Sequence, residues 1–479
     1  MALSPDVVRR LLALWPALAL VGANLVLGLL LARSPGRGSL LALLPAIVVG
    51  VLWLVESNRA VLVFGAFAIN LLVPLPLTDP LPAGFAGITL YPSDVIVLLA
   101  VGSWLVSRLS RRTPAEPRPL QMTALGVPLL LLAATLSVAV VRGHVRYGVP
   151  LVGPPARLLL YAGAAVALAD VPVRQLYRGL VIVFYAGTLW QTVFAVYGYA
   201  SGTSVTNQVI LSTGGERVLA GSTAIFMASA LLLALLNLER TTSAGHSAFH
   251  LGIAVLAAFA LVSTFQRTTF ALVSVLIPLA LLAFRHVTLR AASVIPLFAP
   301  FVALAVLLVP RGDPTVLQTL AHRVTASPNS DATAQWRLHA YEAVWNQVRE
   351  SPLTGVGFGR PARFVLNGND YAVGQDPHNQ FLYLWAGGGL LLLGSFALAL
   401  VAYGIDAWRR FRTATAEERR LIFWAVSTCF VFLVNAATGI ILTVPNLLLP
   451  FWILIALPGV VPTRERARPA PVPAWETGA

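Results

Sequence analysis

The residues of this chain that could do chemistry gather in one polar stretch, residues 311–379. This stretch holds arginines, carboxylates and three histidines, with apolar segments on both sides. Arg337 lies in a tryptophan-rich part of it, and His378 and Asn379 form its end. A guanidinium can grip two phosphate oxygens at once, and an imidazole can accept a proton from a hydroxyl group. Because the rest of the chain is nearly all apolar, we expect this stretch to act on a ligand.

Two further arginines lie outside this stretch, at the ends of apolar runs. Arg217 precedes one long run, and Arg267 sits in a tight turn between two others. An arginine pressed against the bilayer is costly, and such residues usually face a cavity and a partner. The alternatives are that Arg217 pairs with Glu216 and that Arg267 snorkels to the interface. We predict that both arginines lie on the same side of the membrane as His378.

Other features of the polar stretch exclude some chemistry. Gly355, Gly357 and Gly359 do not form a nucleotide loop, since no strand precedes them and no Lys-Ser or Lys-Thr follows. They instead allow a tight turn or a close backbone approach to a ligand. His378 also has a neutral interpretation, as a local cap ahead of the next helix. With Cys429 as the single cysteine and no recognisable metal cluster, we predict neither a metal ion nor a cofactor.

The elements that must position these residues are membrane spans. Hydrophobic residues make up 57% of the chain, charged residues 11%, and the mean hydropathy is +0.79. Apolar runs reach the ~20 residues that cross a hydrocarbon core, and such segments must be helical to satisfy their backbone groups. We therefore predict an all-α polytopic bundle of about 12–14 spans. The predicted spans are 11–32, 39–55, 60–76, 90–107, 123–141, 156–170, 179–200, 218–238, 248–266, 268–284, 291–310, 380–405, 421–440 and 444–461.

The charge distribution predicts the orientation. The net charge of +14 comes from arginine alone, and the arginine clusters fall on alternate loops. That is the pattern of cytoplasmic loops, so a nucleic-acid partner is not predicted despite the basic pI. Both termini are then cytoplasmic and the polar stretch is extracytoplasmic. The predicted divisions are an N-terminal bundle 1–310, the extracytoplasmic loop 311–379, C-terminal helices 380–461 and a disordered cytoplasmic tail 462–479.

Within the loop, residues 331–350 predict an amphipathic helix. Trp336, Ala340, Val344 and Val348 recur every four residues and form one face. Its aromatic residues suit a helix that lies on the outer surface of the bilayer. The simplest alternative is a connector that lies on this surface and has no further role.

In order and spacing, these elements resemble the O-antigen ligase and polymerase family. The resemblance rests on Arg337, the glycine turn, the His378-Asn379 pair and the upstream arginines 217 and 267, and it covers roughly residues 200–440. One departure is that Gly221-Ser222-Thr223-Ala224 stands where relatives often carry an Asn-Pro-Asn-like stretch. This difference leaves open which branch of the family the chain resembles.

The resemblance implies a metal-independent, inverting glycosyltransferase of the GT-C type in the bacterial inner membrane, with its site facing the periplasm. It implies a polyprenyl (undecaprenyl) diphosphate-linked glycan as donor and a hydroxyl of a glycan, a lipid A core sugar or another molecule as acceptor. Arg217 and Arg267 would hold the diphosphate, and His378 would serve the acceptor. The implied substrate-binding residues are Arg337, Gly355, Gly357, Gly359, Asn379 and Glu216.

Two other classes of function remain open. A transporter or lipid flippase would share the polytopic architecture, but transporters usually show internal repeats and polar residues near the midplane. This sequence shows no repeat, and its polar residues gather at one face. A structural scaffold would leave the outer arginines unexplained. The sequence therefore favours glycan transfer, with transport as the alternative.

Overall fold

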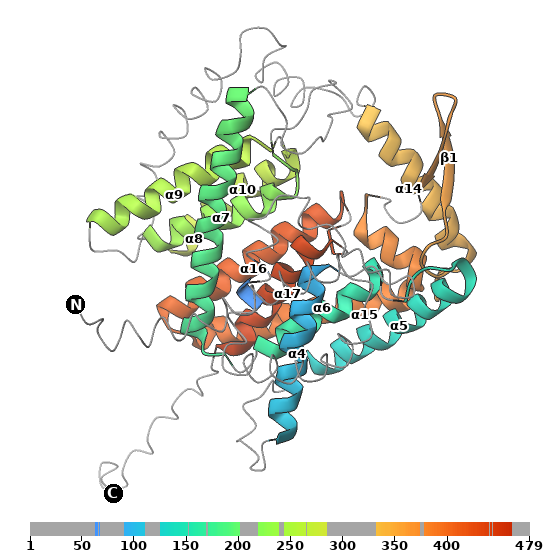
Figure 1. The fold of residues 1–479 in the computed structure, drawn as a ribbon, viewed down its shortest axis with the longest axis horizontal. Coiled ribbons are helices and arrows are strands. Elements are labelled where there is room, and N and C mark those ends of the chain that lie inside the picture. Colours follow the sequence, from blue (N-terminus) through green and yellow to red (C-terminus); the bar gives the residue numbers. More distant parts are fainter. Residues whose placement is uncertain are drawn as a thin grey trace, which may run out of the picture.

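The structure, a computed structural model, describes residues 63–65, 67, 91–110, 125–151, 153–168, 171–201, 219–238, 244–264, 266–284, 332–373, 378–439, 441–442 and 444–461. These residues form helices and one β-hairpin (Figure 1). The helices are α4 Pro92–Ser110, α5 Gly126–Tyr147, α6 Pro154–Leu168, α7 Val173–Ser201, α8 Thr223–Leu238, α9 Ala244–Val262, α10 Arg267–Ala283, α14 Ala332–Glu350, α15 Gln380–Thr413, α16 Ala416–Ala436 and α17 Pro445–Val460. The strands are β1 Ala362–Leu366 and β2 Asn369–Val373.

The predicted all-α polytopic fold is confirmed. Within the described residues, five helices, α5, α7, α9, α15 and α16, are long and apolar enough to cross a membrane, and five shorter helices are also apolar. The long apolar run from 248 to 284 is divided as predicted, since α9 ends at Val262 and α10 begins at Arg267. Predicted spans 11–32, 39–55 and 291–310, most of 60–76 and the tail 462–479 lie outside the described residues. The total number of spans and the division into domains therefore stay predictions.

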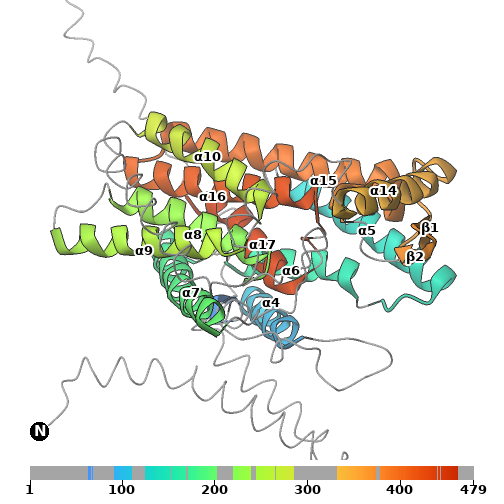
Figure 2. The same cartoon turned by 90° about the horizontal axis from the view of Figure 1, so that it is seen from above.

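Helix α8 forms the centre of the bundle. Every residue from Thr223 to Leu238 is buried, which suits a helix that is apolar on all sides. Helices α9 and α16 flank it, α15 lies beyond α16, and α5 lies along α15 (Figure 2). Trp424 of α16 is fully buried and donates its indole N–H to the Ser229 carbonyl of α8, 2.9 Å away. The buried indole nitrogen is thus satisfied by the neighbouring helix.

Helix α15 is broken at Gly389, whose φ of 70° and ψ of −170° are not helical. The segment after α14 fills this break. The N–H groups of Leu390 and Leu391 donate to the carbonyls of Pro352 and Leu353, at 2.8 and 3.1 Å. The backbone groups that the break releases from the helix thereby find partners, as burial requires. The segment after α14 is consequently hydrogen-bonded to α15, the helix that follows the polar stretch.

The polar stretch contains a β-hairpin that the sequence analysis did not predict. Strands β1 and β2 pair antiparallel, with Ala362 opposite Val373 and Phe364 opposite Tyr371. Asn367 and Gly368 form the turn and both have positive φ, 53° and 78°, as a two-residue type I′ turn requires. The hairpin lies beside α14, which itself packs against α15 (Figure 1). An Asn-Gly pair between β-prone residues is the signal that could have found it.

Candidate active site

His378 sits at the start of α15 in an uncommon backbone conformation. Its φ is 51°, in the left-handed region that non-glycine residues rarely adopt. The Tyr341 hydroxyl of α14 donates to its carbonyl at 2.9 Å, and the Trp336 ring lies 5.1 Å from the imidazole ring. Asn379 follows it and caps α15 by accepting the Leu382 N–H at 3.0 Å. The backbone of His378 is therefore held by Tyr341, while its half-buried imidazole lies beside the Trp336 ring.

Arg337 brings a cation to the same region. It precedes Tyr341 by one turn of α14, so both side chains lie on one face of that helix. The Nε atom of Arg337 is buried and has no hydrogen-bond partner in the described part of the chain. A guanidinium with an unused donor of this kind favours a phosphate or another oxygen-rich ligand.

The start of α10 meets the end of α16 close to this point. The Tyr341 hydroxyl lies 3.4 Å from the carbonyl of Ala437, just after α16. Two residues earlier, the side-chain oxygen of Asn435 accepts hydrogen bonds from Thr269 at 3.1 Å and from Gln266 at 3.4 Å. Arg267, the first residue of α10, therefore begins its helix where α16 ends. Nothing is described of the Arg267 side chain.

Arg217 and Glu216 lie outside the described residues, so their positions stay predictions. The description resumes at Leu219, whose N–H donates to the Ser263 carbonyl at 3.3 Å. Ser263 belongs to the turn between α9 and α10. The entry to α8 thus lies against the turn that leads to Arg267.

Gln380 is a site residue that the sequence analysis missed. Its side chain is fully buried, and its oxygen accepts the Leu442 N–H at 3.0 Å. Its amide nitrogen has no hydrogen-bond partner among the residues that the structure describes. An unsatisfied buried donor one residue after Asn379 is costly unless the site supplies a partner. A glutamine at the start of an apolar run was the available signal.

The three glycines of the turn lie against helices rather than in open space. Gly355, Gly357 and Gly359 have φ values of 65°, 97° and 90°. The N–H groups of Val356 and Gly357 donate to the α15 carbonyls of Ala386 and Gly387, at 2.8 and 3.0 Å. Arg142 of α5 donates from its Nη1 to the carbonyls of Thr354 and Gly355. These contacts support the predicted turn and close approach, whereas binding of a substrate by the glycines stays a prediction.

We expect Gly355→Ala to destabilise the protein. A Cβ at this position would lie 2.5 Å from the Gly389 nitrogen and 2.6 Å from the Gly387 carbonyl, and backbone atoms cannot easily move away. Alanine at a positive φ adds strain of about 1–3 kcal/mol. The midpoint of thermal unfolding in detergent measures the effect. Gly394→Ala is the matched control, because a Cβ there meets nothing within 4 Å. Equal midpoints for the two variants would contradict this role of Gly355.

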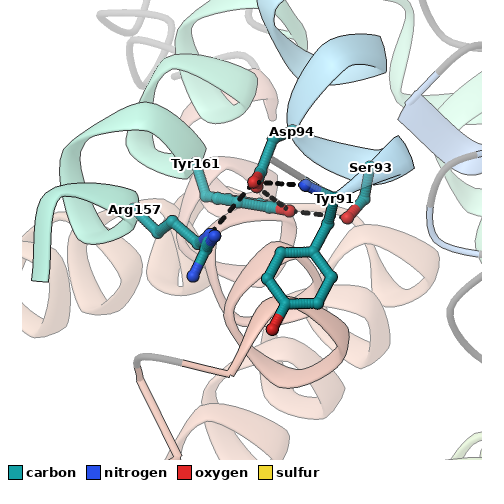
Figure 3. Close-up of polar contacts among 5 residues, drawn as sticks. All are labelled: Tyr91, Ser93, Asp94, Arg157 and Tyr161. Carbon is teal, nitrogen blue, oxygen red and sulfur yellow. Dashed lines mark hydrogen bonds and ion pairs between the residues drawn. The ribbon is translucent and has the colours of Figure 1, made fainter. Parts of the chain in front are cut away.

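A second polar cluster lies within the helices, where sequence analysis predicted none (Figure 3). Asp94 of α4 and Arg157 of α6 are almost fully buried and form an ion pair at 3.0 Å. The Tyr161 hydroxyl donates to Asp94 at 2.8 Å and lies 2.8 Å from the Ser93 hydroxyl, and the Tyr91 N–H also donates to Asp94. The Arg157 guanidinium stacks 4.4 Å from the Tyr91 ring centre. A carboxylate at the start of a predicted span was the signal for this pair.

One exposed ion pair fixes the end of α14. The Arg360 guanidinium bonds both carboxylate oxygens of Glu350 and holds the pKa of that carboxyl below its usual range. Since Arg360 precedes β1 by two residues, the pair ties the hairpin to α14.

The sequence also contains one histidine pair at a spacing used by metal sites, His246 and His250 at the start of α9. The Nδ1 atom of His250 lies 2.8 Å from the Tyr185 hydroxyl. Within the described residues, no third histidine, cysteine or carboxylate joins them. The pair alone therefore gives no support for a metal site.

Comparison with protein-family models gives a match. Residues 252–397 match the model of the O-antigen ligase family. This range begins in α9 and includes α10, α14, the hairpin and the start of α15, so it contains Arg267, Arg337 and His378. No curated protein matches the chain. With its polytopic helical fold and this matched region, the chain is similar to the O-antigen ligase family of membrane proteins.

Proposed function

We propose that this protein is a metal-independent glycosyltransferase of the GT-C type. It transfers a glycan from a polyprenyl diphosphate carrier to an acceptor hydroxyl, as an O-antigen ligase or polymerase does. The observation that carries the proposal is the meeting of three elements at one end of the bundle. Tyr341 of α14 contacts both the His378 carbonyl and the end of α16, and that end contacts the start of α10 at Thr269.

In this reaction the bond between the anomeric carbon and the phosphate oxygen breaks while the acceptor oxygen attacks from the opposite face. Negative charge develops on the departing diphosphate, and preorganised cations stabilise it by a few kcal/mol each. Arg217 and Arg267 supply this charge and grip the diphosphate. His378 accepts the proton of the attacking hydroxyl or orients that hydroxyl. A single displacement inverts the anomeric centre.

Arg337, Asn379 and the three glycines complete this assignment. The unused Nε donor of Arg337 is available to an oxygen of the donor glycan or its diphosphate. Asn379 acts through the backbone, since its side chain caps α15 and thereby holds His378 at the helix start. Gly355, Gly357 and Gly359 shape the turn that packs against α5 and α15.

The arginine distribution supports the orientation in which this end faces the periplasm. Residues 406–420, where α15 ends and α16 begins, carry five arginines. This connection is assigned to the cytoplasm, at the far end of α15 from His378. The carrier lipid would then reach the site from the outer leaflet of the inner membrane. The acceptor, a glycan or a lipid A core sugar, would approach from the periplasm.

Surface glycans of a deletion strain test the proposal. We expect mass analysis to show single repeats attached to the acceptor if a polymerase is lost, and long chains retained on the carrier if a ligase is lost. In both cases the carrier-linked glycan reaches the outer leaflet. Glycan trapped on the cytoplasmic leaflet would favour a flippase instead, and an unchanged glycan profile would contradict the proposal.

A further inference from the structure

An aromatic surface extends from the hairpin to His378. Phe364 on β1 and Tyr371 on β2 are register partners, and their rings stack with centres 5.3 Å apart and planes 15° apart. The Trp336 ring of α14 lies nearly perpendicular to both, at 5.7 and 6.4 Å. Its distance to the His378 ring is 5.1 Å. We call Trp336, Phe364 and Tyr371 the aromatic platform.

The platform differs from the packed core beneath it. Ala340, Val344 and Val348 of α14 are at most 4% exposed and form the contact between this helix and its neighbours. The three platform rings are only half-buried, so each keeps part of its surface accessible. The core beneath would hold the hairpin on α14 even without a ring at the outer positions. Half-exposed rings next to His378, the residue proposed to serve the acceptor, therefore indicate a role beyond packing.

The surroundings of the platform favour a sugar as its occupant. Arg337 follows Trp336 on α14, and its buried Nε atom has no hydrogen-bond partner among the described residues. An acyl chain would gain nothing from this charge. A pyranose ring matches both features, because its C–H face carries partial positive charge that suits an aromatic face, while its hydroxyl rim can bond charged groups.

We propose that the aromatic platform binds a sugar ring of the acceptor glycan by stacking and so presents the acceptor hydroxyl to His378. This inference rests on the proposed glycan transfer. Stacking on the platform requires only a pyranose ring, and such rings are present both in acceptor glycolipids and in the carrier-linked glycan. Because the Trp336 ring lies against His378, the residue proposed to serve the acceptor, the platform is assigned to the acceptor.

Binding to the purified full-length protein in nanodiscs tests this assignment. One probe is the oligosaccharide released by mild acid from the acceptor glycolipids of a deletion strain. The second is the oligosaccharide released from its polyprenyl diphosphate lipids, and the third is polyprenyl diphosphate without sugar. Tyr371→Leu removes the aromatic face and keeps an apolar side chain of similar size, whereas Tyr371→Phe keeps the ring. Trp408→Ala removes an exposed aromatic ring on α15, toward the end of that helix away from His378.

We expect Tyr371→Leu to bind the acceptor oligosaccharide about tenfold more weakly, while Tyr371→Phe and Trp408→Ala bind it as the wild type does. Polyprenyl diphosphate should bind equally to all variants, which shows that the site is still folded. A stronger effect on the carrier-derived oligosaccharide would overturn the assignment to the acceptor. Wild-type affinity in Tyr371→Leu, or equal loss in Tyr371→Phe, would overturn stacking. Sugar binding by a wild type that transfers nothing would instead contradict the proposed function.

Discussion

Arg157→Met is expected to lower the stability of the folded protein by about 3–5 kcal/mol, because it leaves the Asp94 carboxylate buried without its cation. Asp94→Leu should also lower the stability, since the buried guanidinium then loses this carboxylate partner. The double variant should recover part of this loss, because no isolated charge remains buried. Recovery is incomplete, since the Tyr161 hydroxyl and the Tyr91 N–H still lose an acceptor.

The midpoint of thermal unfolding in detergent measures these differences. Glu350→Ala is the matched control, because it removes an ion pair whose side chains are 33% and 53% exposed. We expect that control to unfold close to the wild type, as exposed pairs generally contribute little. If both single variants also unfolded at the wild-type midpoint, the ion pair would not hold α4 to α6.

The helices could be predicted from the sequence because each is a local run of apolar residues bounded by polar ones. The predicted span 218–238 corresponds to α8, and the break near Gln266 separates α9 from α10. The amphipathic helix begins at Ala332, one residue from its predicted start. The hairpin could also have been predicted, from Asn367-Gly368. It was not predicted because the apolar periodicity of the polar stretch, at residues 331–350, is that of a helix.

The contacts of the site could not be predicted, because they join residues far apart in the chain. Tyr341 and His378 are 37 positions apart, and Arg157 and Asp94 are 63 apart. Nothing in the local sequence indicates that Trp336 contacts the His378 ring. Types of residue indicate which chemistry is available, whereas tertiary packing decides which side chains meet. The sequence therefore predicted the candidate residues but not the platform, Gln380 or the buried ion pair.

His378→Ala is expected to reduce transfer by about 10²–10⁴-fold, the usual contribution of a positioned acid or base, and to leave donor binding nearly unchanged. Arg267→Lys should fail differently. Lysine keeps the charge but loses the planar grip on two phosphate oxygens, so donor affinity should fall together with transfer. Arg217→Lys should behave in the same way. The three variants thereby separate binding of the donor from activation of the acceptor.

Matched controls come from the same residue types elsewhere in the chain. Arg363→Lys changes an exposed arginine on the hairpin, and His246→Ala changes an exposed histidine at the start of α9. Both should transfer normally. Every variant must reach the membrane at wild-type abundance. Full transfer by His378→Ala would remove this residue from the mechanism, and unchanged donor affinity in both arginine variants would remove the diphosphate assignment.

The central claim is that this protein itself forms the new glycosidic bond, and transfer by the purified wild type in nanodiscs measures it. The reactants are polyprenyl diphosphate-linked glycan and acceptor glycolipid from a deletion strain, in buffer with EDTA. We expect acceptor molecules whose mass increases by that of the glycan, with one polyprenyl diphosphate released for each, and about 10²–10⁴-fold less product from His378→Ala. Folded protein that binds the donor yet forms no product, or forms it only when magnesium or manganese is restored, would contradict the account.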